Sequence, residues 1–99
     1  MAEGSVTITH RGTGDQGEYT ARVEGVAETG ELTWRAQDDN VRVATHTGVP
    51  RSLRGQGIAA RLVDALIADA RKQGFRIVPA CSYVAARFEE HPEWADLRA

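Results

Sequence analysis

The sequence predicts an α+β fold in which a mixed, mainly antiparallel sheet packs against one long helix and is followed by a short C-terminal helix. Apolar and polar residues alternate through the first half of the chain with the period of two that is typical of strands. Between positions 56 and 73 the apolar residues recur instead with the period of an amphipathic helix. One more apolar run and a short helical segment follow, so the predicted order is four strands, a helix, a strand and a helix.

The first four segments have the pattern of half-buried strands joined by short turns. In the second of them Tyr19, Ala21 and Val23 alternate with polar neighbours, and the same alternation occurs in the other three. Turns rich in glycine or aspartate separate the segments, which favours an antiparallel meander. The predicted strands are Ser5–Thr9, Glu18–Val26, Leu32–Gln37 and one beginning at Val41, and the predicted turns are Arg11–Gly17, Glu28–Gly30 and Asp38–Asn40.

The segment Gln56–Gln73 is predicted to be a long helix. At 100° per residue its apolar side chains fall on one continuous half of the helix, and only Asp69 falls near the edge of that half. Gly74 is well placed to end the helix, because glycine adopts the left-handed conformation at little cost. The apolar positions are Ile58, Ala59, Leu62, Val63, Leu66, Ile67 and Ala70.

The last quarter of the chain predicts a strand and a second, shorter helix. Phe75–Pro79 is a short apolar run that is predicted to be a strand ending at Pro79. The long helix before it then connects the fourth strand to this one as a crossover. Ser82–Glu90 has helical character, with Ser82 as its expected cap and a break after it at His91. The two tryptophans of the chain, Trp34 and Trp94, are expected to be core or interface anchors.

Size and charge exclude several classes of protein. The chain is too short for separate cofactor and substrate domains, so residues 1–99 are expected to form a single domain. With 12 basic and 14 acidic residues its net charge is −2, which gives no bulk attraction to nucleic acid or to an anionic membrane. No apolar run is long enough to span a bilayer. Any anion must therefore be bound by local groups.

The cysteine count and the first residues indicate a cytoplasmic protein. Cys81 is the only cysteine and cannot form an intramolecular disulfide, and Met1–Gly4 has neither a basic patch nor the apolar run of a signal peptide. The three histidines are scattered, so no ligand spacing predicts a metal site. A monomer and a homodimer are both compatible with the sequence.

Chemistry is expected in the segment between the fourth strand and the long helix. Gly55 and Gly57 allow the backbone to approach a ligand closely, and the first amides of a helix lack internal acceptors. Arg51 and Arg54 add positive charge beside them. The segment therefore predicts a phosphate or pyrophosphate site. The structural alternative is that the two glycines only form a turn before the helix.

Two well-known phosphate loops do not account for this segment. The P-loop needs a Gly-Lys-Ser/Thr sequence that the chain lacks. Gly55-x-Gly57-x-x-Ala60 matches the dinucleotide fingerprint, but that loop belongs to an alternating βαβ array with an acidic residue on the next strand. Here meandering strands come first and Phe75–Val78 carries no acidic residue.

Four separated blocks of the sequence resemble the miniature branch of the GNAT superfamily of N-acyltransferases. Arg54-x-x-Gly57-x-Ala59 is similar to the acyl-coenzyme A loop of that superfamily. The resemblance covers about Val41–Leu97 and more loosely the whole chain. The blocks, in order, are His46-Thr47-x-Val49-Pro50, Arg54-Gly55-x-Gly57-Ile58-Ala59, Val78-Pro79-x-Cys81-Ser82-Tyr83-Val84 and His91-Pro92-Glu93.

The resemblance implies a GNAT-like fold and acetyl-coenzyme A as cosubstrate, with no metal. The pantetheine arm is expected in a splay between the fourth and fifth strands. The two helices that larger GNAT enzymes carry between their first two strands are missing here, so the site for the amine or protein acceptor is expected to be open. By the same resemblance the backbone amides around Arg54–Ala59 hold the coenzyme pyrophosphate. The residues expected to bind the coenzyme are Val49, Arg54, Gly55, Gln56, Gly57, Ile58 and Ala59.

Three residues are candidates for the catalytic step. Cys81 precedes a predicted helix, where free amides and the helix dipole lower a thiol pKa, so it is an acyl-accepting nucleophile, a lining residue or a small buried side chain. His46 is expected on the face of its strand opposite Val43 and Thr45, as a general base or as a histidine anchored at the sheet edge. Tyr83 is expected to protonate the departing thiolate or simply to pack.

Three functions follow from these residues. The first is an acetyltransferase that uses acetyl-coenzyme A, by direct attack of an amine or through an acyl-Cys81 intermediate. The second is a non-catalytic acyl-coenzyme A binding or sensing module that keeps the loop. The third is a purely structural α+β domain. A measurement of acetyl transfer distinguishes the acetyltransferase from the binding module. A measurement of coenzyme binding distinguishes both of these from the structural domain.

Overall fold

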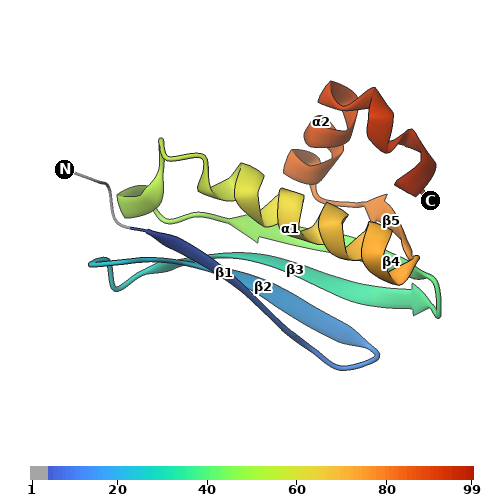
Figure 1. The fold of residues 1–99 in the computed structure, drawn as a ribbon, viewed down its shortest axis with the longest axis horizontal. Helices are drawn as coiled ribbons and strands as arrows, with labels where there is room; N and C mark the ends of the chain where they lie inside the picture. Colours follow the sequence, from blue (N-terminus) through green and yellow to red (C-terminus); the bar gives the residue numbers. More distant parts are fainter. Residues whose placement is uncertain (1–4) are drawn as a thin grey trace.

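The computed structural model describes residues 5–99 and contains one five-stranded sheet with two α-helices (Figure 1). Met1–Gly4, the segment used above to exclude a signal peptide, lies outside the described residues. The strand order is β1-β2-β3-β4-β5, with antiparallel pairs except for the parallel pair β4 and β5. The predicted mixed, mainly antiparallel sheet is thus confirmed. The elements are β1 (Val6–Gly12), β2 (Gln16–Val23), β3 (Thr29–Asp38), β4 (Val41–Gly48), η1 (Arg51–Leu53), α1 (Ile58–Gln73), β5 (Arg76–Pro79), α2 (Ser82–Glu90) and η2 (Pro92–Leu97).

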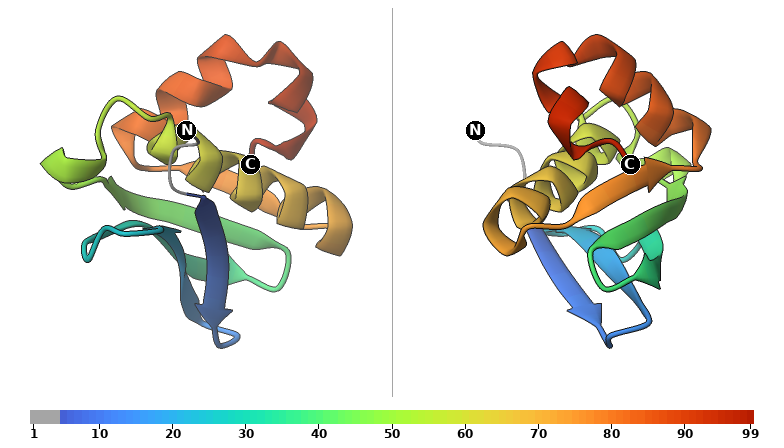
Figure 2. Two further views of the ribbon diagram at one scale, coloured as in Figure 1. Left: turned by 60° about the vertical axis from the view of Figure 1, so that its left-hand side comes forward. Right: turned by 90° about the vertical axis from the view of Figure 1, so that its right-hand side faces the viewer.

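The helices lie on one side of the sheet, and the other side is left open (Figures 1 and 2). The buried face of α1 packs on β1, β2 and β3, and α2 packs against β4 and β5. We call the helix-covered side the inner face and the other side the outer face. No helix within residues 5–99 has the length and apolar character needed to cross a membrane. Every ligand that reaches the sheet from outside therefore meets either the outer face or the strand edges.

The long helix is confirmed, with a start two residues later than predicted. Gly57 adopts a left-handed φ of 72° and caps the helix, so Gln56 lies in the loop. Gly74 ends the helix at φ 82°, as expected. Asp69, at the edge of the apolar half, accepts a 2.6 Å hydrogen bond from the buried Tyr19 hydroxyl. This bond explains how a carboxylate is accommodated at that position.

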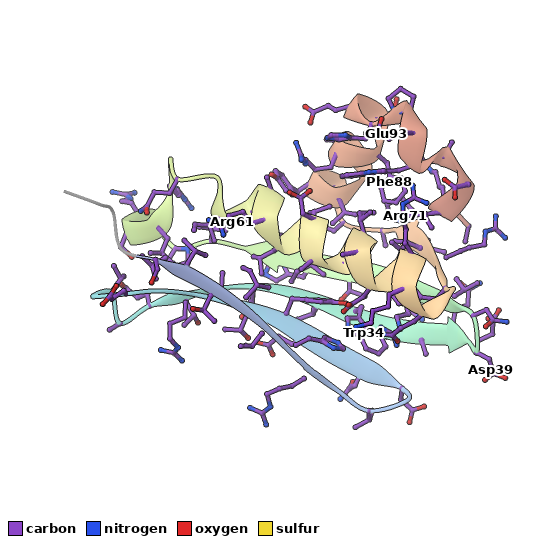
Figure 3. All side chains as sticks on the ribbon, viewed as in Figure 1. Trp34, Asp39, Arg61, Arg71, Phe88 and Glu93 are labelled. Carbon is purple, nitrogen blue, oxygen red and sulfur yellow. The ribbon has the colours of Figure 1, made fainter. Side chains whose placement is uncertain are left out.

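The bounds predicted for two turns, Arg11–Gly17 and Glu28–Gly30, are wrong because some of their glycines lie in strands, where they leave room for neighbouring side chains. Gly12 and Gly17 pair within the β1–β2 hairpin, and a Cβ atom on Gly17 would lie 2.5 Å from the Trp34 ring. Trp34 is buried at 2% exposure against this hairpin, below the C-terminal half of α1 (Figure 3). Gly30 lies inside β3, where Ile58 of α1 approaches it closely. The reversal before β3 is made instead near Gly25, at φ 83°.

A β-bulge in β4 overturns the predicted orientation of His46. Thr33 pairs with His46, whereas Trp34 pairs with Ala44, so Thr45 is an extra residue in β4. One extra residue reverses the alternation of side chains beyond it. Trp34 faces inward and Thr33 outward, so His46 lies on the outer face, on the same side as Thr45 and not opposite to it.

The C-terminal helix has the predicted bounds but a different cap. Cys81 is the N-cap residue of α2, and Ser82 is the first helical residue. The tail beyond it, for which the sequence made no prediction, forms the 3₁₀ helix η2 and buries Trp94 at 7% exposure. Trp34 and Trp94 are therefore both core residues, as expected. Cys81 becomes the last residue before the chain turns away from the sheet.

Candidate functional site

The loop before α1 presents a run of free backbone amides. No backbone or side-chain oxygen of residues 5–99 accepts a hydrogen bond from the amides of residues 55–60. The first turn of α1 contains no acidic residue that would compete for them. Gly55 and Gly57 both have positive φ, and a Cβ atom on either would meet open space. Glycine is therefore favoured at these two positions because of the positive φ, and the open space in front of them is accessible to an anion.

The same loop is held in place by polar contacts at both ends. Arg54 Nε donates a 3.3 Å hydrogen bond to the carbonyl oxygen of Val49, which closes the loop on itself. Ser52 donates a 2.8 Å hydrogen bond to Glu28, which ties η1 to the turn before β3. Leu53 is fully buried and anchors the loop in the core. Arg51 and Arg54 are exposed and precede the free amides by a few residues in the chain, so this segment carries positive charge as well as hydrogen-bond donors.

Strands β4 and β5 separate beyond Ala44, so the expected splay is present. Their parallel pairing ends where Ala44 faces Pro79, and the amide of Cys81 donates the last hydrogen bond, 3.0 Å to the Ala44 carbonyl. β4 continues to Gly48, paired only with β3. Among residues 5–99 no strand covers this edge of β4 after Ala44. Its peptide groups are free to bind an extended ligand in the manner of an added strand.

Cys81 lies at the splay on the inner face. Its thiol is partly buried and donates a 3.5 Å hydrogen bond to the hydroxyl of Thr47, whose strand partner Leu32 is a core residue. Burial alone raises the pKa of the Cys81 thiol. Hydrogen bonding to Thr47 and to the backbone of Val84 and Tyr83 outweighs burial, so the pKa lies below its ordinary value. The thiolate is thus favoured at the start of α2.

We expect iodoacetamide to alkylate Cys81 at lower pH in the folded protein than in the denatured chain. Only the thiolate reacts, and the lowered pKa produces thiolate at lower pH. The measurement is the alkylation rate against pH, with the same protein in guanidinium chloride as the reference. A folded midpoint at or above the denatured midpoint would show that burial outweighs the hydrogen bonds.

His46 faces solvent on the outer face and is paired with a carboxylate. Its Nε2 atom lies 3.4 Å from Oε2 of Glu31, a residue of β3 that pairs directly with Gly48. A Cβ atom on Gly48 would lie 2.9 Å from the same Nε2 atom. The absence of a side chain at Gly48 therefore leaves room for the histidine ring beside Glu31. A carboxylate at this distance orients the imidazole ring.

The structure separates the three catalytic candidates. Cys81 and Thr47 are on the inner face, whereas His46 and Glu31 are on the outer face of the same strand pair. The phenol of Tyr83 is half-buried against the core, and its hydroxyl makes no hydrogen bond within residues 5–99. Cys81 and His46 thus do not form a nucleophile–base pair, and the splay lies between them.

Sequence reasoning missed three residues of this site. Glu31 and Thr47 act through partners on other segments of the chain, so no local spacing reveals them. Thr45 is the bulged residue, and its hydroxyl lies 2.7 Å from that of Thr33. The signal for it was the polar run of Thr45 and His46 after two apolar residues, which breaks strict alternation.

Two comparisons with known proteins bear on this geometry. A family model described as GCN5-related N-acetyl-transferase matches residues 18–97, from β2 to η2. The solution structure of a GCN5-like protein from Staphylococcus aureus is similar to this chain with a TM-score of 0.69 and 24% sequence identity. That likeness covers 100% of this chain and 91% of the other, and at this identity it shows the fold.

Proposed function

This chain belongs to the GCN5-related N-acetyl-transferase family, and on that premise we propose that it transfers the acetyl group of acetyl-coenzyme A to an amine. The observation that carries the proposal is the run of free amides at residues 55–60 beside the open edge of β4. The oxygens of a pyrophosphate accept hydrogen bonds from free amides at the start of a helix. An extended pantetheine arm supplies hydrogen-bond partners for the free peptide groups at the edge of β4.

The coenzyme is proposed to lie along one continuous path over the loop and the splay. The amides of residues 55–60 hold the pyrophosphate, and the side chains of Arg51 and Arg54 add positive charge to this end of the path. Val49 follows the last residue of β4 and packs against the core, so it anchors the start of the loop. The free peptide groups of Thr45–Gly48 orient the arm, so that its thioester ends near the bulge.

The proposed transfer uses residues on both faces of the sheet. The coenzyme supplies an acetyl thioester, and an acceptor amine approaches its carbonyl carbon from the outer face. His46 takes one proton from the acceptor ammonium, with Glu31 holding the imidazole in place. The amine nitrogen then bonds to the carbonyl carbon as the carbon–sulfur bond breaks. The Tyr83 hydroxyl is proposed to give a proton to the departing thiolate, and the excess proton of the new amide nitrogen passes through water to restore the phenol.

A covalent route through Cys81 is the second version of the same function. Its lowered pKa favours attack of the Cys81 thiolate on the thioester, which leaves the acetyl group on the Cys81 sulfur and expels the coenzyme as a thiolate that takes a proton from water. His46 lies on the other face of the sheet, so this version needs no Cys–His pair. In this version the acceptor amine attacks the Cys81 thioester in a second step.

Intact-mass analysis after incubation with acetyl-coenzyme A tests both versions. The covalent route predicts an adduct of about 42 Da, the mass of an acetyl group, that peptide digestion maps to Cys81 and that Cys81→Ala removes. The direct route predicts no adduct and continued transfer to an amine by Cys81→Ala. Coenzyme binding with neither adduct nor transfer to any amine would instead support a binding or sensing module.

A further inference from the structure

We infer that the acceptor of this protein is a small primary amine whose carbon chain carries several hydroxyl groups, and that it binds in a hollow on the outer face. The inference rests on the proposed acetyl transfer and names the substrate class of that site. The hollow has a volume of about 980 Å³, at the upper end of the range for small-molecule sites. It lies between the β1–β2 hairpin and the neighbouring strands β3 and β4.

The hollow adjoins the proposed reaction centre. Thr33 and Thr45 both line it. Thr33 pairs directly with His46, and Thr45 is the bulged residue before His46. Residues that face each other on neighbouring strands have their Cβ atoms about 5 Å apart. His46 does not itself line the hollow, but it is the direct neighbour of two residues that do, and Glu31 lies beside it. The ammonium end of a ligand is proposed to lie at this side of the hollow.

Hydroxyl groups dominate the walls of the hollow. Thr20 and Thr33 contribute hydroxyls from β2 and β3, and Thr45 contributes one from the bulge. Thr20 donates a 3.3 Å hydrogen bond to Glu18, and this carboxylate keeps further lone pairs for a ligand. The rings of His10 and Trp34 line one part of the hollow, and its other lining residues are glycines or polar residues. Thr45 donates its proton to the Thr33 carbonyl and Thr33 donates to Thr45, so these hydroxyls, like that of Thr20, accept hydrogen bonds from a ligand. The walls therefore suit a ligand whose hydroxyl groups donate to them.

The charges around the hollow favour a ligand with one cationic end. Arg11 and Glu18 face each other on β1 and β2, and Glu18 in turn faces Thr33. Arg11 makes no ion pair within 4.0 Å inside the part of the chain that the structure describes, so its guanidinium donors are available for hydroxyl oxygens. Glu18 and Glu31 attract an ammonium group toward His46. A polyhydroxylated amine uses the donors, the acceptors and the carboxylates together.

A matched pair of six-carbon amines tests the inference. Glucamine, a linear amine with five hydroxyl groups, is compared with hexylamine as acceptors at saturating acetyl-coenzyme A. Each neutral hydrogen bond contributes about 1 kcal/mol, so three of them predict a preference of at least about 100-fold in kcat/KM for glucamine. Equal use of the two amines, or a preference for hexylamine, overturns the inference.

Variants locate the preference in the hollow. Thr20→Val keeps the side-chain shape and removes one hydroxyl, and it is expected to lower kcat/KM for glucamine about 5-fold to 10-fold without affecting hexylamine. Glu18→Gln is the second variant, for which KM for glucamine is expected to rise. Thr7→Val, on the same face but outside the lining residues, is the control. An equal loss in Thr7→Val, or no loss in Thr20→Val and Glu18→Gln, contradicts the assignment.

A binding measurement keeps this inference separate from the proposed transfer. In an NMR titration of the protein with each amine, glucamine is expected to shift the methyl signals of Thr20, Thr33 and Thr45, and hexylamine is not. Acetyl-coenzyme A binding without glucamine shifts overturns the hollow and leaves the coenzyme site standing. Glucamine shifts in these threonines without coenzyme binding support the hollow and remove the proposed transfer.

Discussion

Gly57→Glu is expected to abolish binding of acetyl-coenzyme A while the fold stays intact. Gly57 caps α1 at φ 72°, and its Cβ position faces open space in front of the free amides of residues 55–60. A carboxylate there occupies the proposed pyrophosphate position and repels its charge. Losing about two hydrogen bonds to a charged group, at about 1.5 kcal/mol each, predicts at least a 100-fold rise in Kd.

Two matched variants separate charge from backbone strain in this experiment. Gly57→Gln places a neutral side chain of the same shape at the same φ, and it is expected to weaken binding much less. Gly74→Ala strains the other end of the same helix, at φ 82°, and is expected to cost about 1 kcal/mol of stability without changing Kd. A Gly57→Glu protein that is folded by circular dichroism and binds acetyl-coenzyme A like the parent would refute the loop assignment.

His46→Ala is expected to lower acetyl transfer by about 10²-fold to 10⁴-fold, the usual contribution of a positioned general base. The Kd for acetyl-coenzyme A should stay the same, because His46 lies on the outer face while the loop amides lie beyond the end of β4. The experiment measures kcat and Kd for the same preparation. A fall in binding with no fall in kcat would mean that His46 supports the coenzyme site and is not the base.

Glu31→Gln distinguishes a positioning carboxylate from a purely structural one. The amide keeps the size of the Glu31 side chain but loses the charge 3.4 Å from His46. We expect a smaller loss of kcat than in His46→Ala, an unchanged Kd for acetyl-coenzyme A, and no additional loss when Glu31→Gln is combined with His46→Ala, because the carboxylate acts by orienting the imidazole. A loss in the double variant equal to the sum of the two single losses would show that Glu31 does not act through His46.

The elements with strong local signals were predictable from sequence. The period of the apolar residues in α1 and the left-handed glycine at Gly74 are local features, and both agree with the structure. The glycine-rich loop and the order of the strands also carried enough information to propose the coenzyme site and the sheet. Gly30 was mistaken for a turn because sequence does not distinguish a turn glycine from one that lets Ile58 approach a strand.

The catalytic geometry was less accessible because it depends on contacts between strands. The bulge at Thr45 reverses the face of His46, and it is a property of the pairing between β3 and β4 rather than of β4 alone. The imidazole of His46 has room beside the Glu31 carboxylate because Gly48 carries no side chain there. Cys81 and His46, both candidates in sequence, therefore lie on opposite faces.

The central claim is that the free amides before α1 bind the coenzyme, and a calorimetric titration of the protein with acetyl-coenzyme A tests it most directly. The account predicts saturable binding of one coenzyme per chain, weakened by added salt because charged groups contribute to it. It predicts the same affinity in His46→Ala and the loss of binding in Gly57→Glu. The absence of saturable heat at millimolar acetyl-coenzyme A would contradict the claim and remove the basis of the proposed transfer.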